Sequence, residues 1–197
     1  AWPAFRVLTF QYGMSDVVAS QEAMLRESLA EAEQRRERES GELGRRVEEL
    51  RASLDRQTAE ADATDAALKA AQSAMRAGAF DRALTLVDGV LSGTPDHVEA
   101  KYMAAVCARY LTKDDLAIAH LETLRALVPE FGRGFQEEGH LRRRRGENDA
   151  ALQAFQTACR YTPALTASWT ASADLLDLAG PPAEATAARA HAARLAG

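Results

Sequence analysis

A small set of residues returns every 34 positions over the C-terminal two-thirds of the chain. Alanine recurs four times at this interval, and a proline follows three of these alanines by twelve residues. A glycine precedes three of the alanines by five residues, and Thr112 takes that place once. The residues are Ala83, Ala117, Ala151 and Ala185; Pro95, Pro129 and Pro163; and Gly78, Gly146 and Gly180. A fixed period of this length is typical of stacked helix–turn–helix repeats.

The residue types at these positions have physical reasons. A small alanine lets two helices approach closely, and a larger side chain there would overpack by about 1–3 kcal/mol. Glycine supplies the left-handed residue that ends a helix, and proline stops one helix and starts the next. Phe80, Phe155 and Trp169 fall where such repeats carry large side chains. The pattern predicts an all-α tetratricopeptide-repeat (TPR) solenoid of three and a half to four repeats.

The period also places the elements of this array, which we expect over residues 66–197. The predicted repeats are 64–97, 98–131, 132–165 and 166–197. Within them we expect helices near 64–77, 80–93, 97–111, 114–127, 132–145 and 148–160, then one from Thr166 and one from about Pro181–Pro182. About three repeats are enough for a solenoid to fold alone, so the array needs no other domain for stability.

The segment 1–13 differs from the rest of the chain. It contains Trp2, Phe5, Phe10 and Tyr12 and ends at Gly13, a composition that favours extended backbone. Met14 then resembles an ordinary start. Two interpretations remain open: a non-native leader, or an extended peptide that docks on an apolar groove.

Residues 14–65 predict a charged helical arm rich in Glu, Arg, Ala and Leu. This segment has fourteen Asp and Glu against eight Arg, so it carries the acidity of the chain. Two apolar runs at steps of three and four resemble a heptad seam, but the stretch from Glu33 to Glu42 interrupts them. The runs are Val18, Leu25, Leu29 and Ala32, then Leu43, Val47, Leu50 and Leu54. The arm is therefore either a weak coiled coil that self-associates through 15–65, or a solvated or internally packed helix.

Composition excludes several classes of function. The net charge of −5 argues against general nucleic-acid binding, and no apolar run approaches the ~18 residues that cross a membrane. Cys107 and Cys159 fall inside predicted helices and are expected to be buried, reduced thiols, which favours the cytoplasm. His97, His120, His140 and His191 lack metal-ligand spacing, and no nucleophile elbow or phosphate loop occurs. We expect no catalytic residue, metal or cofactor, and thus no enzyme.

A binding surface is the better hypothesis. In such arrays the first helix of each repeat lines a concave groove. The predicted groove residues are Arg76, Tyr102, Arg109, Tyr110, Arg133, Gln136, His140, Arg143 and Arg144. The range 131–145 holds five Arg against two Glu, and arginine presents a bidentate fork to carboxylate or phosphate. The chain is therefore predicted to be an adaptor for an acidic peptide or protein. Alternatively, these arginines pair with Glu137 and Glu138, or with the arm.

One stretch resembles a particular family. The segments Pro129–Arg133, Gln136–His140, Ala150–Phe155, Thr162–Leu165 and Ala167–Trp169, with Arg142 and Gly146, are similar to the TPR region of bacterial TPR–sulfotransferase proteins. The resemblance covers about residues 68–197, and that family's catalytic domain and donor-binding loop lie outside it. It implies a non-catalytic TPR segment of such an enzyme as the alternative function. A third alternative is a structural oligomerisation module.

Overall fold

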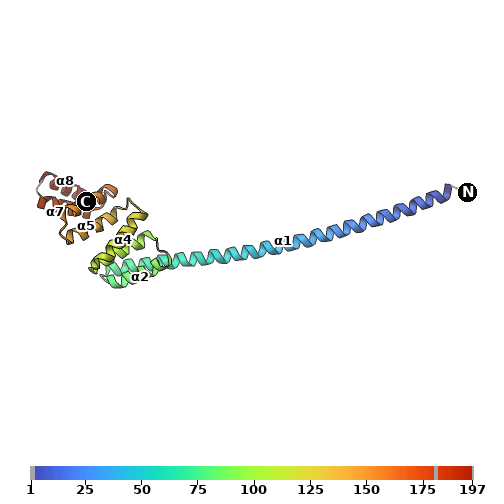
Figure 1. Cartoon of the computed structure of the whole chain (residues 1–197), viewed down its shortest axis with the longest axis horizontal. Coiled ribbons are helices and arrows are strands. Elements are labelled where there is room, and N and C mark those ends of the chain that lie inside the picture. The colour runs from blue at the N-terminus through green and yellow to red at the C-terminus, as the bar shows by residue number, and fades with distance from the viewer. Residues whose placement is uncertain (1–2, 180–181, 197) are drawn as a thin grey trace. The chain divides into compact units, whose positions relative to one another are not determined.

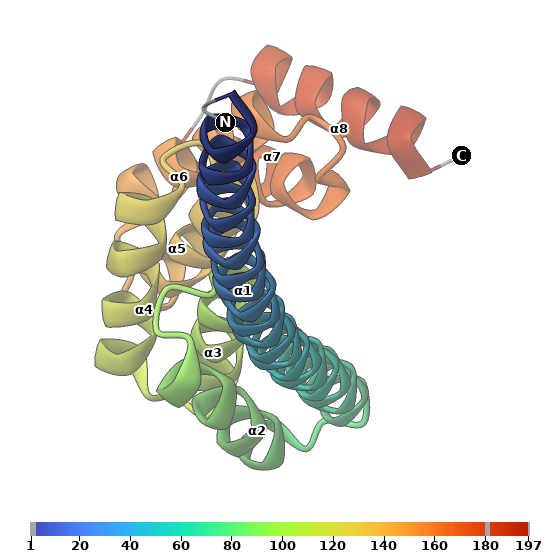
Figure 2. The ribbon, with the colours of Figure 1, turned by 90° about the vertical axis from the view of Figure 1, so that its right-hand side faces the viewer.

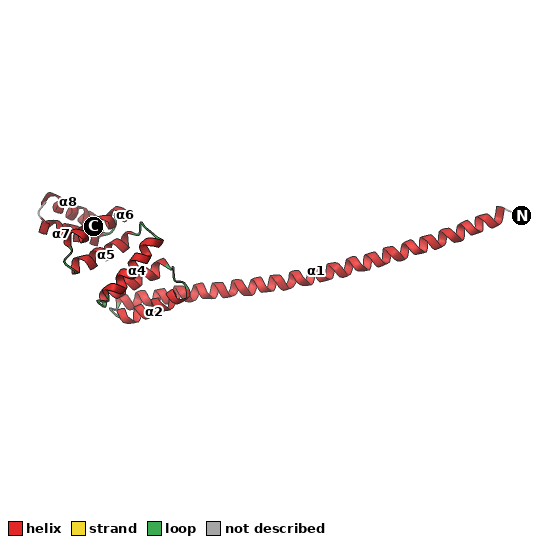
Figure 3. Ribbon diagram, viewed as in Figure 1, coloured by secondary structure: helices red, strands yellow, loops and turns green. Residues whose placement is uncertain are grey.

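The computed structural model describes residues 3–179 and 182–196, and every element in these ranges is a helix (Figure 3). The helices are α1 (Pro3–Arg76), α2 (Phe80–Gly93), α3 (Val98–Tyr110), α4 (Asp114–Leu127), α5 (Gly132–Arg144), α6 (Asn148–Tyr161), α7 (Thr166–Ala179) and α8 (Pro182–Ala196). The chain divides into two units, residues 1–60 and 61–197. The all-α prediction is confirmed.

The first unit contains a single helical segment, the N-terminal part of α1. Residues 3–13 belong to this helix, so the prediction of an extended leader is wrong for them. Strand preference is weak and depends on a partner strand, whereas proline is tolerated in a first helical turn and each further residue extends an existing helix at little cost. Trp2 lies outside the described residues.

The second unit begins inside α1, close to the predicted start of the array at residue 66. The helix expected near 64–77 is therefore not separate but the C-terminal end of α1. The helices α2–α8 match their predicted bounds within two residues. Each of α2–α7 contacts the next, and the ribbon shows them as successive helical hairpins (Figure 1).

The turn between the two helices of a repeat is built the same way three times. Gly78, Thr112 and Gly146 have φ of 75°, 57° and 79°, the left-handed conformation predicted from the glycine spacing. In each turn the next residue donates its backbone N–H to a carbonyl five residues earlier, at 2.9–3.0 Å. These bonds satisfy carbonyls at the end of the first helix. Gly180 lies outside the described residues.

The turns between repeats also repeat. Thr94, Val128 and Thr162 precede the three prolines and have φ of −132° to −136° with ψ of 82° to 87°. Steric conflict with the proline ring drives the preceding residue out of helical conformation. Each still donates its N–H to the carbonyl four residues earlier at 2.8 Å, which closes the helix.

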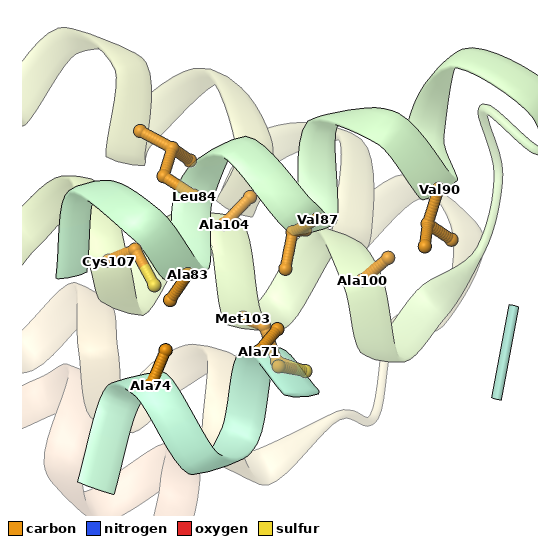
Figure 4. Packing of buried hydrophobic residues seen from close by; sticks show 10 residues of the cluster. All are labelled: Ala71, Ala74, Ala83, Leu84, Val87, Val90, Ala100, Met103, Ala104 and Cys107. Carbon is orange, nitrogen blue, oxygen red and sulfur yellow. The ribbon is translucent and has the colours of Figure 1, made fainter. Parts of the chain in front are cut away.

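Small residues form the contacts between helices. Ala83, Ala117, Ala151 and Ala185 are all completely buried, as their spacing predicted. In the first core cluster Ala71 and Ala74 of α1 face Ala83 and Val87 of α2, with Met103 and Cys107 of α3 alongside (Figure 4).

Cys107 and Cys159 are buried and free, and burial raises the pKa of each thiol to about 11.

Candidate functional site

The predicted groove residues lie mainly on α3 and α5, two helices in mutual contact (Figure 2). An ion pair joins the same position of two successive repeats, because Arg133 of α5 follows Glu99 of α3 by one full period. Arg133 Nη2 lies 2.7 Å from Glu99 Oε2, and Nη1 lies 3.5 Å from Oε1. The two side chains are 41% and 33% exposed, so solvent reaches the pair.

A second ion pair between these helices is buried. Arg109 Nε donates to Glu137 Oε2 at 2.6 Å, and the side chains are only 16% and 4% exposed. Burial disfavours the charge on Arg109, but attraction to Glu137 outweighs it, so the pKa of the guanidinium lies above its ordinary value. Removing either partner would leave the other charge buried alone, which destabilises the fold. The intact pair therefore favours the contact between α5 and α3.

Aromatic rings position the two arginines. The Arg133 guanidinium lies 4.5 Å from the centre of the Tyr102 ring and 5.0 Å from that of Phe131. Arg109 lies 4.3 Å from the Tyr110 ring, which stacks on Phe80 at 4.2 Å. Burial, and then the negative charge of Glu137, raise the pKa of Tyr102 to about 12. The guanidinium groups are thus fixed in direction by stacking as well as by carboxylates.

His140 is neutral at pH 7. Burial, then the positive charges of Arg109 and Arg143, lower its pKa to about 4. Its ring meets the Phe155 ring edge-on, with 5.0 Å between the centres. It therefore serves this surface as a neutral hydrogen-bonding ring rather than as a cation.

The remaining predicted groove residues have different environments. Gln136 accepts a hydrogen bond from Ser168 Oγ of α7 at 2.9 Å. Arg144 donates to the Arg109 carbonyl at 2.8 Å and forms an ion pair with Asp114. Arg76 and Arg143 are exposed, and neither has an ion pair within the described part of the chain. The structure therefore brings Tyr102, Arg109, Arg133 and His140 together but not Arg76.

Carboxylates neutralise much of the basic stretch at the end of α5. Arg142 pairs with Glu138 at 2.6 Å and with Glu147 at 3.4 Å. Arg145 lies 4.0 Å from Asp114 and 3.7 Å from Asp115. The Arg142–Glu138 pair is one of the pairings that the sequence left open as an alternative, whereas Glu147, Asp114 and Asp115 were not expected as partners. Arg143 is exposed and has no ion pair in the described part of the chain.

Glu137 is the structural residue that sequence reasoning missed. Its counterparts in the repeats before and after, Met103 and Ala171, are both buried. Aligning the repeats would therefore have placed a carboxylate at a buried position and shown that it needs a cationic partner. Its neighbour Glu138 faces Arg125 and Arg142 instead.

A hollow lies on the side of α5 that carries Glu138, Leu141 and Arg142. It has a volume of about 190 Å³ between α4 and α5, with an apolar base of Ile118, Leu121 and Leu141. Its rim has three acidic and three basic side chains, namely Glu122, Glu138, Glu147, Arg125, Arg142 and Arg145. The balance of charge gives this hollow no preference for an anion or a cation.

In residues 3–179 and 182–196, no three His, Cys, Asp or Glu side chains gather closely enough to hold a metal ion. No helix among the eight in these ranges is sufficiently long and apolar to cross a membrane.

Comparison with known proteins identifies the fold. Neither a protein-family model nor a curated protein matches the sequence. The TPR protein TTC0263 of Thermus thermophilus is similar in structure, with a TM-score of 0.59 and 23% identity, over 67% of this chain and 74% of that one. A crystal structure of MamA gives a TM-score of 0.58 at 18% identity, over 67% and 77% of the chains. MamA from Desulfovibrio magneticus, from residue 41 to the end, has a TM-score of 0.53 and 19% identity, over 67% of this chain and 73% of that one. Identities this low concern the fold alone, so the resemblance to sulfotransferase-linked repeats stays a prediction. The fold of this chain is that of the TPR proteins.

Proposed function

We propose that this chain is a non-catalytic adaptor that binds an acidic peptide or protein on the face formed by α3 and α5. The observation that carries the proposal is the Arg133 side chain, whose guanidinium lies on the Tyr102 ring and which remains 41% exposed. A guanidinium fixed in this way loses little freedom when it binds a carboxylate. The TPR fold supports a scaffold role, because solenoids present extended surfaces to other proteins.

Arg143 supplies the second contact of the proposed site. It is close to one helical turn beyond His140 on α5 and is exposed. Since His140 is uncharged, it adds a hydrogen bond without repelling a cation on the ligand. Glu99 restricts access to Arg133, so a ligand must bring a carboxylate that replaces or bridges the existing pair.

The test uses a fluorescent hexaglutamate peptide and fluorescence anisotropy. Arg133→Ala and Arg143→Ala should each weaken binding about tenfold, the low end of the usual value for a hydrogen bond to a charged group. The loss should be larger at low salt, because exposed charges are screened less there. Arg160→Ala is the matched control, since Arg160 is also exposed but lies on α6. Equal affinity in Arg133→Ala, Arg143→Ala and wild type would end the proposal.

A repeat segment of a sulfotransferase-type enzyme would have the same fold, so that alternative remains a prediction without a specific observation in its favour. A cytoplasmic location also remains a prediction; it would suit two buried thiols in the reduced state.

A further inference from the structure

A narrow stripe of exposed apolar side chains follows α1 through the first unit. Seven large apolar residues between Val18 and Leu54 belong to it, and their exposed fractions run from 38% to 68%. At 100° per residue they fall within a face about 60° wide, and the stripe is about 54 Å long. A face this narrow matches the seam against one other helix rather than a broad core.

The stripe is symmetric about Arg36. Counted outward from Arg36, apolar side chains recur at the same three separations in both directions. The three pairs are Leu29 with Leu43, Leu25 with Val47, and Val18 with Leu54. A two-fold axis perpendicular to a helix requires this property, because residue i then faces residue j and residue j faces residue i. A parallel pair matches any sequence with itself and requires no such symmetry.

We propose that a second copy of this chain docks antiparallel along the stripe, with the two-fold axis at Arg36. Leu29 of each copy then packs on Leu43 of the other, and Leu25 on Val47. The symmetry supports a second copy as the occupant, because an identical helix read backwards presents apolar side chains at the same spacing for six of the seven stripe residues. The distance from Val18 to Leu54 corresponds to about ten turns of a straight α-helix, so the two helices pair with little supercoiling.

Charges agree with this pairing at the one place where the apolar symmetry fails. Leu50 would face Glu22 of the second copy, because the two positions are equally far from the axis on opposite sides. The stem of Glu22 can cover Leu50 while its carboxylate reaches Arg51 of that chain. Within one chain Glu22 contacts Arg26 at 3.4 Å and Arg51 contacts Glu48 at 2.9 Å, and these exposed pairs exchange partners at little cost. In a parallel pair Glu22 and Arg51 would be about 44 Å apart.

Arg36 meets its own copy at the axis. Glu33 and Glu39 lie three positions before and after it on the same helix, so four carboxylates of the dimer surround the two guanidinium groups. A polar residue at the centre of a helical seam lowers stability but fixes the register, which is the role we assign to Arg36.

Disulfide trapping tests the direction of pairing. Leu29→Cys and Leu43→Cys variants of the full chain are oxidised separately and as a mixture, then separated on a non-reducing gel. Wild type is the control, because Cys107 and Cys159 are buried and their raised pKa keeps them as unreactive thiols. The expected result is a cross-linked dimer in the mixture alone. In a parallel pair each variant would cross-link with itself, which would overturn the proposal.

A charge exchange and a mass measurement complete the test. Glu22→Arg should raise the dissociation constant of the dimer about tenfold, and Glu22→Arg with Arg51→Glu should restore it. Light scattering reports the mass of each variant, and circular dichroism checks that α1 is still helical. A monomer mass for wild type at high micromolar concentration, or no recovery in the double variant, contradicts the antiparallel pair. Because all the arm substitutions lie outside α3 and α5 in the sequence, failure here leaves the adaptor proposal standing.

Discussion

Gly139 and Phe155 form a size-matched pair in the third repeat. A Cβ at Gly139 would lie 2.8–2.9 Å from three atoms of the Phe155 ring, which is completely buried. In the second repeat the equivalent positions hold Ala105 and Leu121, both also buried. In the third repeat, the phenylalanine on α6 is larger than the leucine of the second repeat, and the glycine on α5 is smaller than its alanine. The repeat keeps total volume constant while exchanging atoms between the two helices.

Gly139→Ala should lower the free energy of unfolding by about 1–2 kcal/mol, because overpacking outweighs the helix preference of alanine. Adding Phe155→Leu should recover most of this loss, since the pair then copies the second repeat. Gly89→Ala is the control, because nothing lies within 4 Å of a Cβ there and alanine should stabilise α2. Urea unfolding measures all three. An unchanged urea midpoint for Gly139→Ala would mean that α5 and α6 can move apart to fit the added methyl group without a loss of stability.

The low pKa of His140 makes stability depend on pH. With a pKa of about 4 in the fold and about 6.5 when unfolded, the unfolded chain binds the proton more readily between these values. The contribution of neutral His140 to the free energy of unfolding is fully present above pH 6.5 and is lost as the pH falls to 4. Below pH 4 it does not change further. Solvent near the ring reduces it to about 1–2 kcal/mol. His140→Gln removes the proton site, so the difference between the two unfolding curves should shrink over this window. Parallel curves from pH 7 to 4 would refute the assignment.

At the scale of elements, the turn inside each repeat sets where the helices end. Thr112 is the exception, a β-branched residue with φ of 57° where the other repeats have glycine. Left-handed backbone costs such a residue about 1–2 kcal/mol. Thr112→Gly should therefore stabilise the chain by about 0.5–1 kcal/mol, after the greater freedom of glycine in the unfolded chain is subtracted. Gly146→Thr is the reverse control and should destabilise by at least that amount. If both changes shift the urea midpoint in the same direction, backbone strain is not the cause.

The elements that the sequence predicted well are those with local causes. Glycine and proline act within a few residues of themselves, so the period placed α2 to α8 accurately. The prediction of an extended leader was wrong because strand preference has little effect without a partner strand. Residues 3–13 are part of α1 instead. The ion partners of Arg109 and Arg133 lie 28 and 34 residues away. Spacing placed both arginines on the groove helices, but their pairing with Glu137 and Glu99 depends on how α3 and α5 pack, which spacing alone does not give.

At the scale of the whole molecule, the contacts of the second unit are local in sequence. Each helix of the array packs mainly on its neighbours, so stability is close to a sum of repeats and interfaces. The first repeat depends on the end of α1, because Ala71 and Ala74 form part of its core cluster. The residues given for the three core clusters all lie at Ala67 or later in the chain. The two units should therefore unfold independently.

Truncation tests this division. A chain of residues 61–197 keeps Ala71 and Ala74 and should unfold at the same urea concentration as the array in the full chain. A chain of residues 79–197 lacks both and exposes Ala83, Val87 and Met103, so it should lose several kcal/mol and bind a hydrophobic dye. Circular dichroism and dye fluorescence follow both proteins.

The comparison also separates the two proposals, because the 61–197 chain retains α3 and α5 but lacks the apolar stripe. It should bind hexaglutamate with the affinity of one site and show the mass of a monomer. A 61–197 chain that unfolds well before the full chain would mean that the arm stabilises the array, and that the boundary at residue 60 does not separate two folding units.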